Sequence, residues 1–342
     1  MVTPPVPDIT LPAPGAFDAH THMDFTDVPV ESMLDTARTA GIHRVVNVGC
    51  DIPSSRWAVT AASSYPEVYA AVAIHPNDVA AVEASRPAVL SEIAVLAASP
   101  RVVAVGETGL DYYRDHSAPE LQRSWFRAHV EIAREAGKPV MIHDREAHSD
   151  VLAVLEEYAP WPPYSVIFHC FSGDAAMAAV CAEAGYVMSF AGNVTFKNAG
   201  SLREAAVAAP AELMLAETDA PYLTPVPYRG KPNSPAMTAY TVRFLAELKD
   251  LDLAGFCAQL QSTGARVFGW LWPPRSPAPA PAPAPVPAPA RAPAPADLGG
   301  IMGRLRHRPG TRPGRKRQRP GLTGSVAPSP RMRFGSVAPL AQ

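Results

Sequence analysis

The sequence predicts an α/β protein folded as a (β/α)8 TIM barrel, and three observations lead to this fold class. Short apolar runs rich in Val, Ile and Ala recur eight times between residues 16 and 216. Stretches whose apolar residues have helical spacing separate most of these runs. Polar residues suited to metal binding follow several runs, as expected where the carboxyl-terminal ends of barrel strands meet.

The eight apolar runs are the predicted strands. They cover residues 16–20, 44–49, 69–74, 102–106, 139–142, 165–168, 186–190 and 213–216. Continuously apolar strands that alternate with helices are typical of a parallel sheet covered on both faces. Eight such units over about 250 residues match the usual size of a (β/α)8 barrel. A doubly wound open sheet stays compatible with the pattern, because periodicity does not show closure.

The predicted helices lie between and after these runs. Residues 118–136 have the clearest pattern, with Leu121, Trp125 and Phe126 among apolar residues that recur every three or four positions. Other helices are expected at 30–40, 55–64, 88–97, 146–157, 174–184, 199–208, 235–248 and 252–263. On the predicted helix at 118–136, Trp125 and Phe126 are expected in the core rather than on a surface that stacks bases.

The chain divides by composition into three parts. Residues 1–15 are an N-terminal extension, 16–272 the predicted barrel domain and 273–342 a C-terminal tail. The tail carries 12 Arg or Lys and one acidic residue, a net charge of +11. The preceding 272 residues carry 18 basic and 31 acidic side chains, a net charge of −13. The two sum to the net charge of −2 of the whole chain. Residues 277–295 are rich in Pro and Ala and favour extended polyproline II. We expect the whole tail, Pro/Ala-rich and then Arg-rich, to be disordered.

Cysteine usage and hydropathy predict a cytoplasmic protein. The four cysteines are widely spaced and form no CxxC motif, which favours reduced thiols over a disulfide framework. No basic and apolar signal segment opens the sequence. No run approaches the roughly 18 apolar residues that a membrane span needs. We expect no membrane contact and a monomer, although the sequence does not determine the oligomeric state.

Six residues are candidate metal ligands. His20 and His22 are one residue apart on a predicted strand, so their side chains point to the same face and can reach one ion. Four more candidates each follow another apolar run, and they are Glu107, His143, His169 and Asp219. Because active sites of this fold gather at the carboxyl ends of the strands, all six are expected at one end of the barrel.

These candidates lie in short motifs that occur in a fixed order. The motifs are Asp-Ala-His-Thr-His at 18–22, Ile-His-Pro at 74–76, Gly-Glu-Thr-Gly-Leu-Asp-Tyr-Tyr at 106–113, Ile-His-Asp-Arg at 142–145, His-Cys-Phe-Ser-Gly at 169–173, Thr-Phe-Lys-Asn at 195–198, Glu-Thr-Asp-Ala-Pro-Tyr-Leu at 217–223 and Arg-Gly-Lys-Pro-Asn at 229–233. Together they resemble the TatD family of metal-dependent hydrolases, from about residue 16 to 270. One position departs from the family: Gly264 stands where Asn is expected, which puts a local loop hydrogen bond in doubt.

The resemblance implies a metal-dependent deoxyribonuclease with two divalent ions. His20 and His22 would bind one ion together with Asp219, and His143 and His169 would bind the other. Glu107 would bridge the two ions, because a carboxylate has two oxygens. Two cations about 3.5–4 Å apart can clamp a phosphoryl group and activate water. Asp219 would orient or deprotonate that water as a general base, so Asp219 and Glu107 are the candidate catalytic residues.

The identity of the ion stays open among Mg²⁺, Mn²⁺ and Zn²⁺. Four imidazoles among six ligands favour Zn²⁺ or Mn²⁺. Mg²⁺ prefers oxygen ligands, although members of the family are usually described as Mg²⁺-dependent.

Five residues near the ligand motifs are candidates for substrate binding. They are His75, Asp111, Tyr113, Arg145 and Lys197. The guanidinium fork of Arg145, two residues after a ligand, suits phosphate oxygens. Asp111 and Tyr113 could position substrate or hold a metal ligand in place. His75 could contact substrate or have a structural role only.

The leading hypothesis is a two-metal phosphodiesterase acting on DNA, most simply an exonuclease on single strands. The same metal cage could instead hydrolyse an ester or amide, as in a D-aminoacyl-tRNA deacylase, so RNA and tRNA are possible substrates too. A third alternative is an inactive barrel whose basic tail tethers nucleic acid; the complete set of six ligands argues against it. The tail could bind phosphates in a salt-dependent way or have no role.

Overall fold

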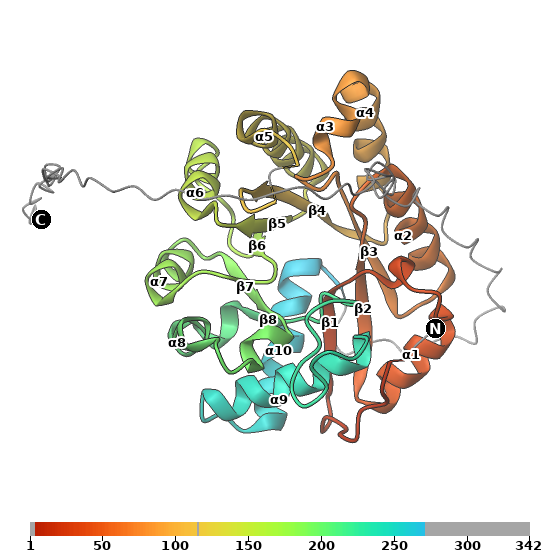
Figure 1. The fold of residues 1–342 in the computed structure, drawn as a ribbon, viewed down its shortest axis with the longest axis vertical. Coiled ribbons are helices and arrows are strands. Elements are labelled where there is room, and N and C mark those ends of the chain that lie inside the picture. Colours follow the sequence, from red (N-terminus) through yellow and green to blue (C-terminus); the bar gives the residue numbers. More distant parts are fainter. Residues whose placement is uncertain (1–3, 115, 271–342) are drawn as a thin grey trace, which may run out of the picture. The chain divides into compact units, whose positions relative to one another are not determined.

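The structure, a computed structural model, describes residues 4–114 and 116–270 and contains one sheet of eight parallel strands (Figure 1). The strands, each paired with the next along the chain, are β1 (Ala16–Thr21), β2 (Ile42–Val48), β3 (Val68–Val72), β4 (Val102–Asp111), β5 (Val140–Arg145), β6 (Val166–Phe168), β7 (Val187–Phe190) and β8 (Met214–Ala216). A parallel bridge between Thr21 and Ala220 joins the end of β1 to the segment after β8. This pairing brings the first and last strands together, so the predicted barrel is confirmed and the open sheet is wrong.

Helices surround the sheet and connect its strands (Figure 1). They are α1 (Val30–Thr39), α2 (Ile52–Ser64), α3 (Val79–Val82), α4 (Arg86–Ala97), α5 (Pro119–Ala136), α6 (His148–Glu157), α7 (Ala175–Glu183), α8 (Gly200–Ala208), α9 (Thr238–Leu248) and α10 (Leu253–Phe268). Helix α5 illustrates why they form: Pro119 suits a first helical turn, and Gly137 ends the helix in the left-handed conformation at φ 63°. As predicted, its Trp125 and Phe126 are buried in the core.

Strands β4 and β5 continue beyond the apolar runs that predicted them. The run at 102–106 was expected to end before Glu107, but β4 extends to Asp111 and pairs with β5 as far as Arg145. Gly109 permits this pairing, since its φ is +135° and a Cβ there would lie 2.2 Å from the His143 carbonyl oxygen. The strand extensions are polar because they form the end of the barrel that carries the candidate ligands.

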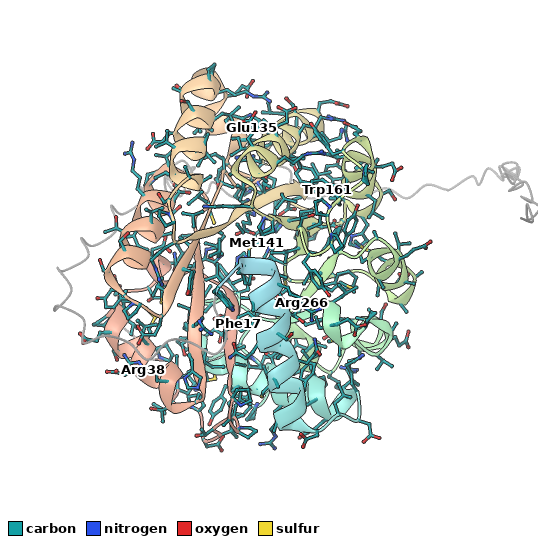
Figure 2. All side chains as sticks on the ribbon, turned by 180° about the vertical axis from the view of Figure 1, so that it is seen from behind. Phe17, Arg38, Glu135, Met141, Trp161 and Arg266 are labelled. Atoms are coloured by element: carbon teal, nitrogen blue, oxygen red, sulfur yellow. The ribbon has the colours of Figure 1, made fainter. Side chains whose placement is uncertain are left out.

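Helix α10 packs against β1 and β8, and Figure 2 shows it from behind. The Phe17 ring on β1 packs edge-on against Phe268 and Trp270, with ring centroids 6.2 and 4.9 Å away. Gly264 lies in α10 rather than in a loop, and a Cβ at this position would lie 2.4 Å from Phe17 Cζ. The absence of a side chain at Gly264 therefore makes room for the Phe17 ring, and the expected loop hydrogen bond has no loop to stabilise.

The parts outside the barrel are described only in part. Leu11 of the predicted N-terminal extension is buried, and its N–H donates to the Ala40 carbonyl at 3.0 Å. The predicted tail at 273–342 and its start after residue 272 lie outside the described residues. The four cysteines are free thiols. Among the helices of the described ranges, none combines the length and the apolar character that a membrane crossing requires.

Buried His129 on α5 makes stability depend on pH. Its Nε2 accepts from the Ile74 N–H at 3.2 Å and its Nδ1 lies 3.0 Å from the Trp125 carbonyl oxygen, so the neutral ring satisfies both. Burial lowers the pKa of His129 to about 4, below the value of about 6.5 in an unfolded chain. The unfolded state therefore binds more protons between these values, and stability falls as pH decreases through this window.

From pH 7 to pH 5 the free energy of unfolding of the wild type should decrease by about 2 kcal/mol more than that of His129→Gln, measured by urea denaturation. Equal losses in the two proteins would contradict this assignment.

Candidate metal centre

His20 and His22 direct their ring nitrogens toward one point at the end of β1. Both side chains are buried, and their Nε2 atoms are 3.1 Å apart. His22 Nδ1 lies 2.8 Å from the carbonyl oxygen of Val48. A carbonyl only accepts, so Nδ1 carries a proton and Nε2 of His22 faces the centre.

Glu107 lies between two pairs of histidines, and each of its carboxylate oxygens faces a different pair. Oε1 is 3.6 Å from His20 Nε2 and 3.4 Å from His22 Nε2. Oε2 is 2.8 Å from His169 Nε2 and 3.2 Å from His143 Nδ1. Burial by itself would raise the pKa of Glu107, but the surrounding histidines, with His169 foremost, lower it well below its usual value. The ionised carboxylate thus has one oxygen available to each histidine pair.

Asp219 approaches the first histidine pair from the segment after β8. Its Oδ1 is 3.6 Å from His22 Nε2 and 3.8 Å from His20 Nε2. Burial opposes ionisation, but the nearby imidazoles of His22, His20 and His169 lower the pKa of Asp219. Asp18, which shares the strand with the histidines, does not face them: it accepts from Thr218 N at 2.8 Å and from Thr218 Oγ1 at 2.5 Å. Asp18 therefore anchors the residue that precedes Asp219.

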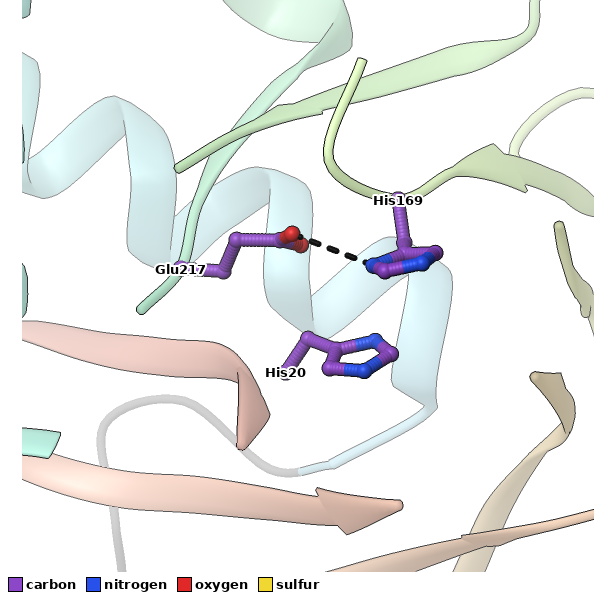
Figure 3. Close-up of side chains that lie close together, drawn as sticks. All are labelled: His20, His169 and Glu217. Atoms are coloured by element: carbon purple, nitrogen blue, oxygen red, sulfur yellow. Dashed lines mark hydrogen bonds and ion pairs between the residues drawn. The ribbon is translucent and has the colours of Figure 1, made fainter. Parts of the chain in front are cut away.

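Glu217 is a functional candidate that the sequence analysis did not single out (Figure 3). Its Oε1 lies 3.2 Å from His169 Nδ1 and accepts from the Cys170 N–H at 2.7 Å. The ring of His20 stacks on that of His169, with centroids 3.9 Å apart. Its position in the sequence could have identified it, because Glu217 is the first residue after β8 and other candidates also follow strands. The Glu217 carboxylate accepts from His169 Nδ1 and so fixes the ring with Nε2 directed toward Glu107.

Replacing Glu217 with Gln should weaken metal binding by about 10- to 100-fold, because an amide no longer fixes the His169 ring and its proton as a carboxylate does. Isothermal titration with Mn²⁺ or Zn²⁺ measures this directly. Glu156→Gln, an exposed glutamate on α6, is the matched control. Equal affinities in the two variants would contradict the orienting role of Glu217.

The residues expected to bind substrate occupy different positions around this centre. His75 Nε2 is 3.8 Å from Glu107 Oε2, while its Nδ1 accepts from the Asn77 N–H at 3.0 Å. Burial lowers the pKa of His75 to about 3, so the ring is neutral and its single proton is on Nε2, facing the centre. Asp111 accepts from Asn77 Nδ2 at 2.9 Å and lies 3.3 Å from His143 Nε2. His75 is thus placed as a hydrogen-bond donor, and Asp111 as a support for His143.

A cavity of about 690 Å³ opens above these residues. Arg114 and Arg145 line it, and within residues 4–114 and 116–270 neither guanidinium forms an ion pair with a carboxylate. The Arg145 guanidinium lies 4.1 Å from the centre of the Tyr113 ring, which is 59% exposed. Exposed Phe25 and Tyr222 also line the cavity. Lys197 is exposed but does not belong to the cavity lining.

The donor set fits divalent cations. Among the residues that the structure describes, three groups of three potential ligands have their atoms within 4.8 Å of one another: His20, His22 and Glu107; His75, Glu107 and His143; and His20, His169 and Glu217. Imidazole nitrogens and carboxylate oxygens that converge in this way form a donor set that a bound metal ion would stabilise. Burial and opposing charges of this kind are typical of catalytic sites.

The sequence of this chain matches a known protein family. The family model described as "TatD related DNase" matches residues 17–269. An "Uncharacterized metal-dependent hydrolase TatD" from Mycobacterium tuberculosis is 46% identical over 264 residues, covering 75% of this chain and 98% of the relative. A "3'-5' ssDNA/RNA exonuclease TatD" from Klebsiella pneumoniae is 34% identical over 244 residues, covering 70% of this chain and 91% of the relative.

A solved structure has the same fold. The crystal structure of YJJV, a TatD homologue from Escherichia coli K12, superposes with a TM-score of 0.68 at 25% identity, covering 75% of this chain and 98% of that one. The match to the family model, the identity to its relatives and the histidine–carboxylate centre at the barrel end all agree with the motifs of the sequence. This chain belongs to the TatD family of metal-dependent hydrolases.

Proposed function

We propose that this hydrolase is a two-metal phosphodiesterase that degrades single-stranded DNA from an end. The observation that carries the proposal is the division of the Glu107 carboxylate, with Oε1 toward His20 and His22 and Oε2 toward His143 and His169. A single-ion site would need only one of these pairs, whereas a bridging carboxylate serves two ions. Such a pair stabilises the attacking and leaving oxygens of an in-line displacement.

The six ligands divide between the two ions as follows. His20, His22 and Asp219 would hold the first ion, and His143 and His169 would hold the second, with Glu107 shared. Bound there, the ions would supply Lewis-acid stabilisation and lower the pKa of water. Imidazole nitrogens suit Zn²⁺ and Mn²⁺, while the family's hydrolytic chemistry also accommodates Mg²⁺, so all three ions belong in the test.

The protein's own side chains orient the substrate and move the proton. Ionised Asp219 accepts a proton from the attacking water as general base. The Nε2–H of His75 donates to a phosphoryl oxygen beside Glu107. Arg145, held over the Tyr113 ring, binds a second phosphate oxygen with its guanidinium fork.

Two further observations favour a nucleic acid over a neutral ester or amide. Arg114 and Arg145 line the cavity without carboxylate partners, an environment that attracts an anionic phosphodiester. Exposed Phe25 and Tyr222 border the same cavity and offer faces on which bases can stack. The Klebsiella relative named as a 3'-5' ssDNA/RNA exonuclease supports degradation from the 3' end.

The test is digestion of single-stranded DNA labelled at its 5' or its 3' end, with Mg²⁺, Mn²⁺ or Zn²⁺, beside a D-aminoacyl-tRNA. We expect mononucleotide release from the 3' end with at least one ion, and inhibition by EDTA that added metal reverses. Deacylation of the tRNA with no release from DNA would refute the proposal and establish the deacylase alternative.

A further inference from the structure

A second cavity, of about 680 Å³, lies next to the metal cavity, and Leu223 lines both. Its walls come from the loop after β8, residues 221–232, and from Phe196. Tyr222, which lines the metal cavity, is 55% exposed and comes directly before the shared residue. A ligand that extends from the metal centre past Leu223 would therefore enter the second cavity.

Two cations line this second cavity, Arg229 and Lys231. Both are exposed, and neither has an ion-pair partner among the residues that the structure describes. The Arg229 guanidinium lies 4.3 Å from the centre of the Phe196 ring, so a cation–π contact holds it against one wall. The charge of the cavity is positive and uncompensated, which suits an anionic ligand.

The walls are held in place by hydrogen bonds. Thr224 Oγ1 donates to the Lys231 carbonyl at 2.6 Å, which closes the loop on itself. The Val226 N–H donates to Thr195 Oγ1 at 2.9 Å, which joins the loop to the Phe196 side. At Gly192 a Cβ would lie 2.2 Å from the Leu223 carbonyl oxygen, so a larger residue would push the loop away. The cavity is therefore a preorganised part of the protein surface.

We infer that this second cavity binds a backbone phosphate of the nucleic-acid strand beyond the bond that is cleaved. The inference rests on the proposed phosphodiesterase function and adds a subsite to it. Arg229 and Lys231 would contact the phosphate, and the exposed ring of Tyr222 would lie beside the nucleotide between the two cavities. A strand long enough to reach the subsite gains this binding energy, whereas a small phosphodiester does not.

The test compares the double variant Arg229→Gln and Lys231→Gln with the wild type on two substrates. Turnover of bis(p-nitrophenyl) phosphate, which is too small to reach the subsite, should be retained and also reports correct folding. On single-stranded DNA of ten or more nucleotides the KM should rise by about 10-fold or more, because charge-assisted phosphate contacts are lost. The slope of log KM against log salt should also flatten by about 0.7, since each neutralised single-strand phosphate contributes about 0.7 and the variant loses one.

The control is Arg56→Gln with Arg243→Gln, which removes the same charge from exposed positions on α2 and α9. If both double variants have the same KM and salt slope while the wild type digests DNA, the subsite is refuted and the proposed function stands. If the wild type hydrolyses neither DNA nor the small phosphodiester with any of the three ions, the proposed function fails, and the subsite with it.

Discussion

Replacing Glu107 with Ala should lower kcat/KM by about 10³-fold or more at every metal concentration. The change removes Oε1 from His20 and His22 and Oε2 from His143 and His169 at the same time. Metal-ion stabilisation of a phosphoryl transition state amounts to several kcal/mol, and about 4 kcal/mol corresponds to a factor of roughly 10³. Steady-state kinetics over a range of Mn²⁺ concentrations measure the loss.

A comparison with His169→Ala separates bridging from simple ligation. Of the two carboxylate oxygens of Glu107, His169 lies next to Oε2, so its removal weakens one site, and excess metal should restore part of the activity. Glu204→Ala, an exposed glutamate on α8, controls for the loss of a carboxylate elsewhere. A Glu107→Ala enzyme with the wild-type kcat would show that the bridging role is wrong.

Replacing Asp219 with Asn should lower kcat by about 10²- to 10⁴-fold with little change in KM for short oligonucleotides. Asn has the same shape and can still lie beside His20 and His22, but it cannot accept the proton of the attacking water. Single-turnover measurements under saturating metal isolate this step from binding.

The matched control is Asp35→Asn, an exposed aspartate on α1 that pairs with Arg38. Titration with Mn²⁺ shows whether Asp219→Asn still binds metal. A variant that binds metal normally and has wild-type kcat would remove Asp219 from the proton-transfer step.

Local patterns in the sequence were enough to predict the elements and most residues of the centre. Apolar runs and helical spacing depend on neighbours a few positions away, so they predict strands and helices without knowledge of the fold. The alternation of side chains along a strand likewise placed His20 and His22 on one face. The motif around Glu107 marked it as a candidate, although β4 continues to Asp111 beyond its apolar run.

Contacts between distant segments could be decided only by the tertiary structure. Barrel closure depends on Thr21 meeting Ala220, and the room for the Phe17 ring depends on Gly264 in α10. No local periodicity encodes either pair, because the partners are about 200 residues or more apart along the chain.

The orientation of individual atoms is the other property that the fold decided. The sequence by itself determined a TatD-like barrel with six candidate ligands at one end. Only the packing of β4 among β1, β5 and the segment after β6 turned one oxygen of Glu107 toward each histidine pair. Only the same packing set Glu217 behind His169 and turned Asp18 toward Thr218. The direction of a side chain depends on its rotamer and on the neighbours that the folded backbone supplies, and these are absent from the order of residues along the chain.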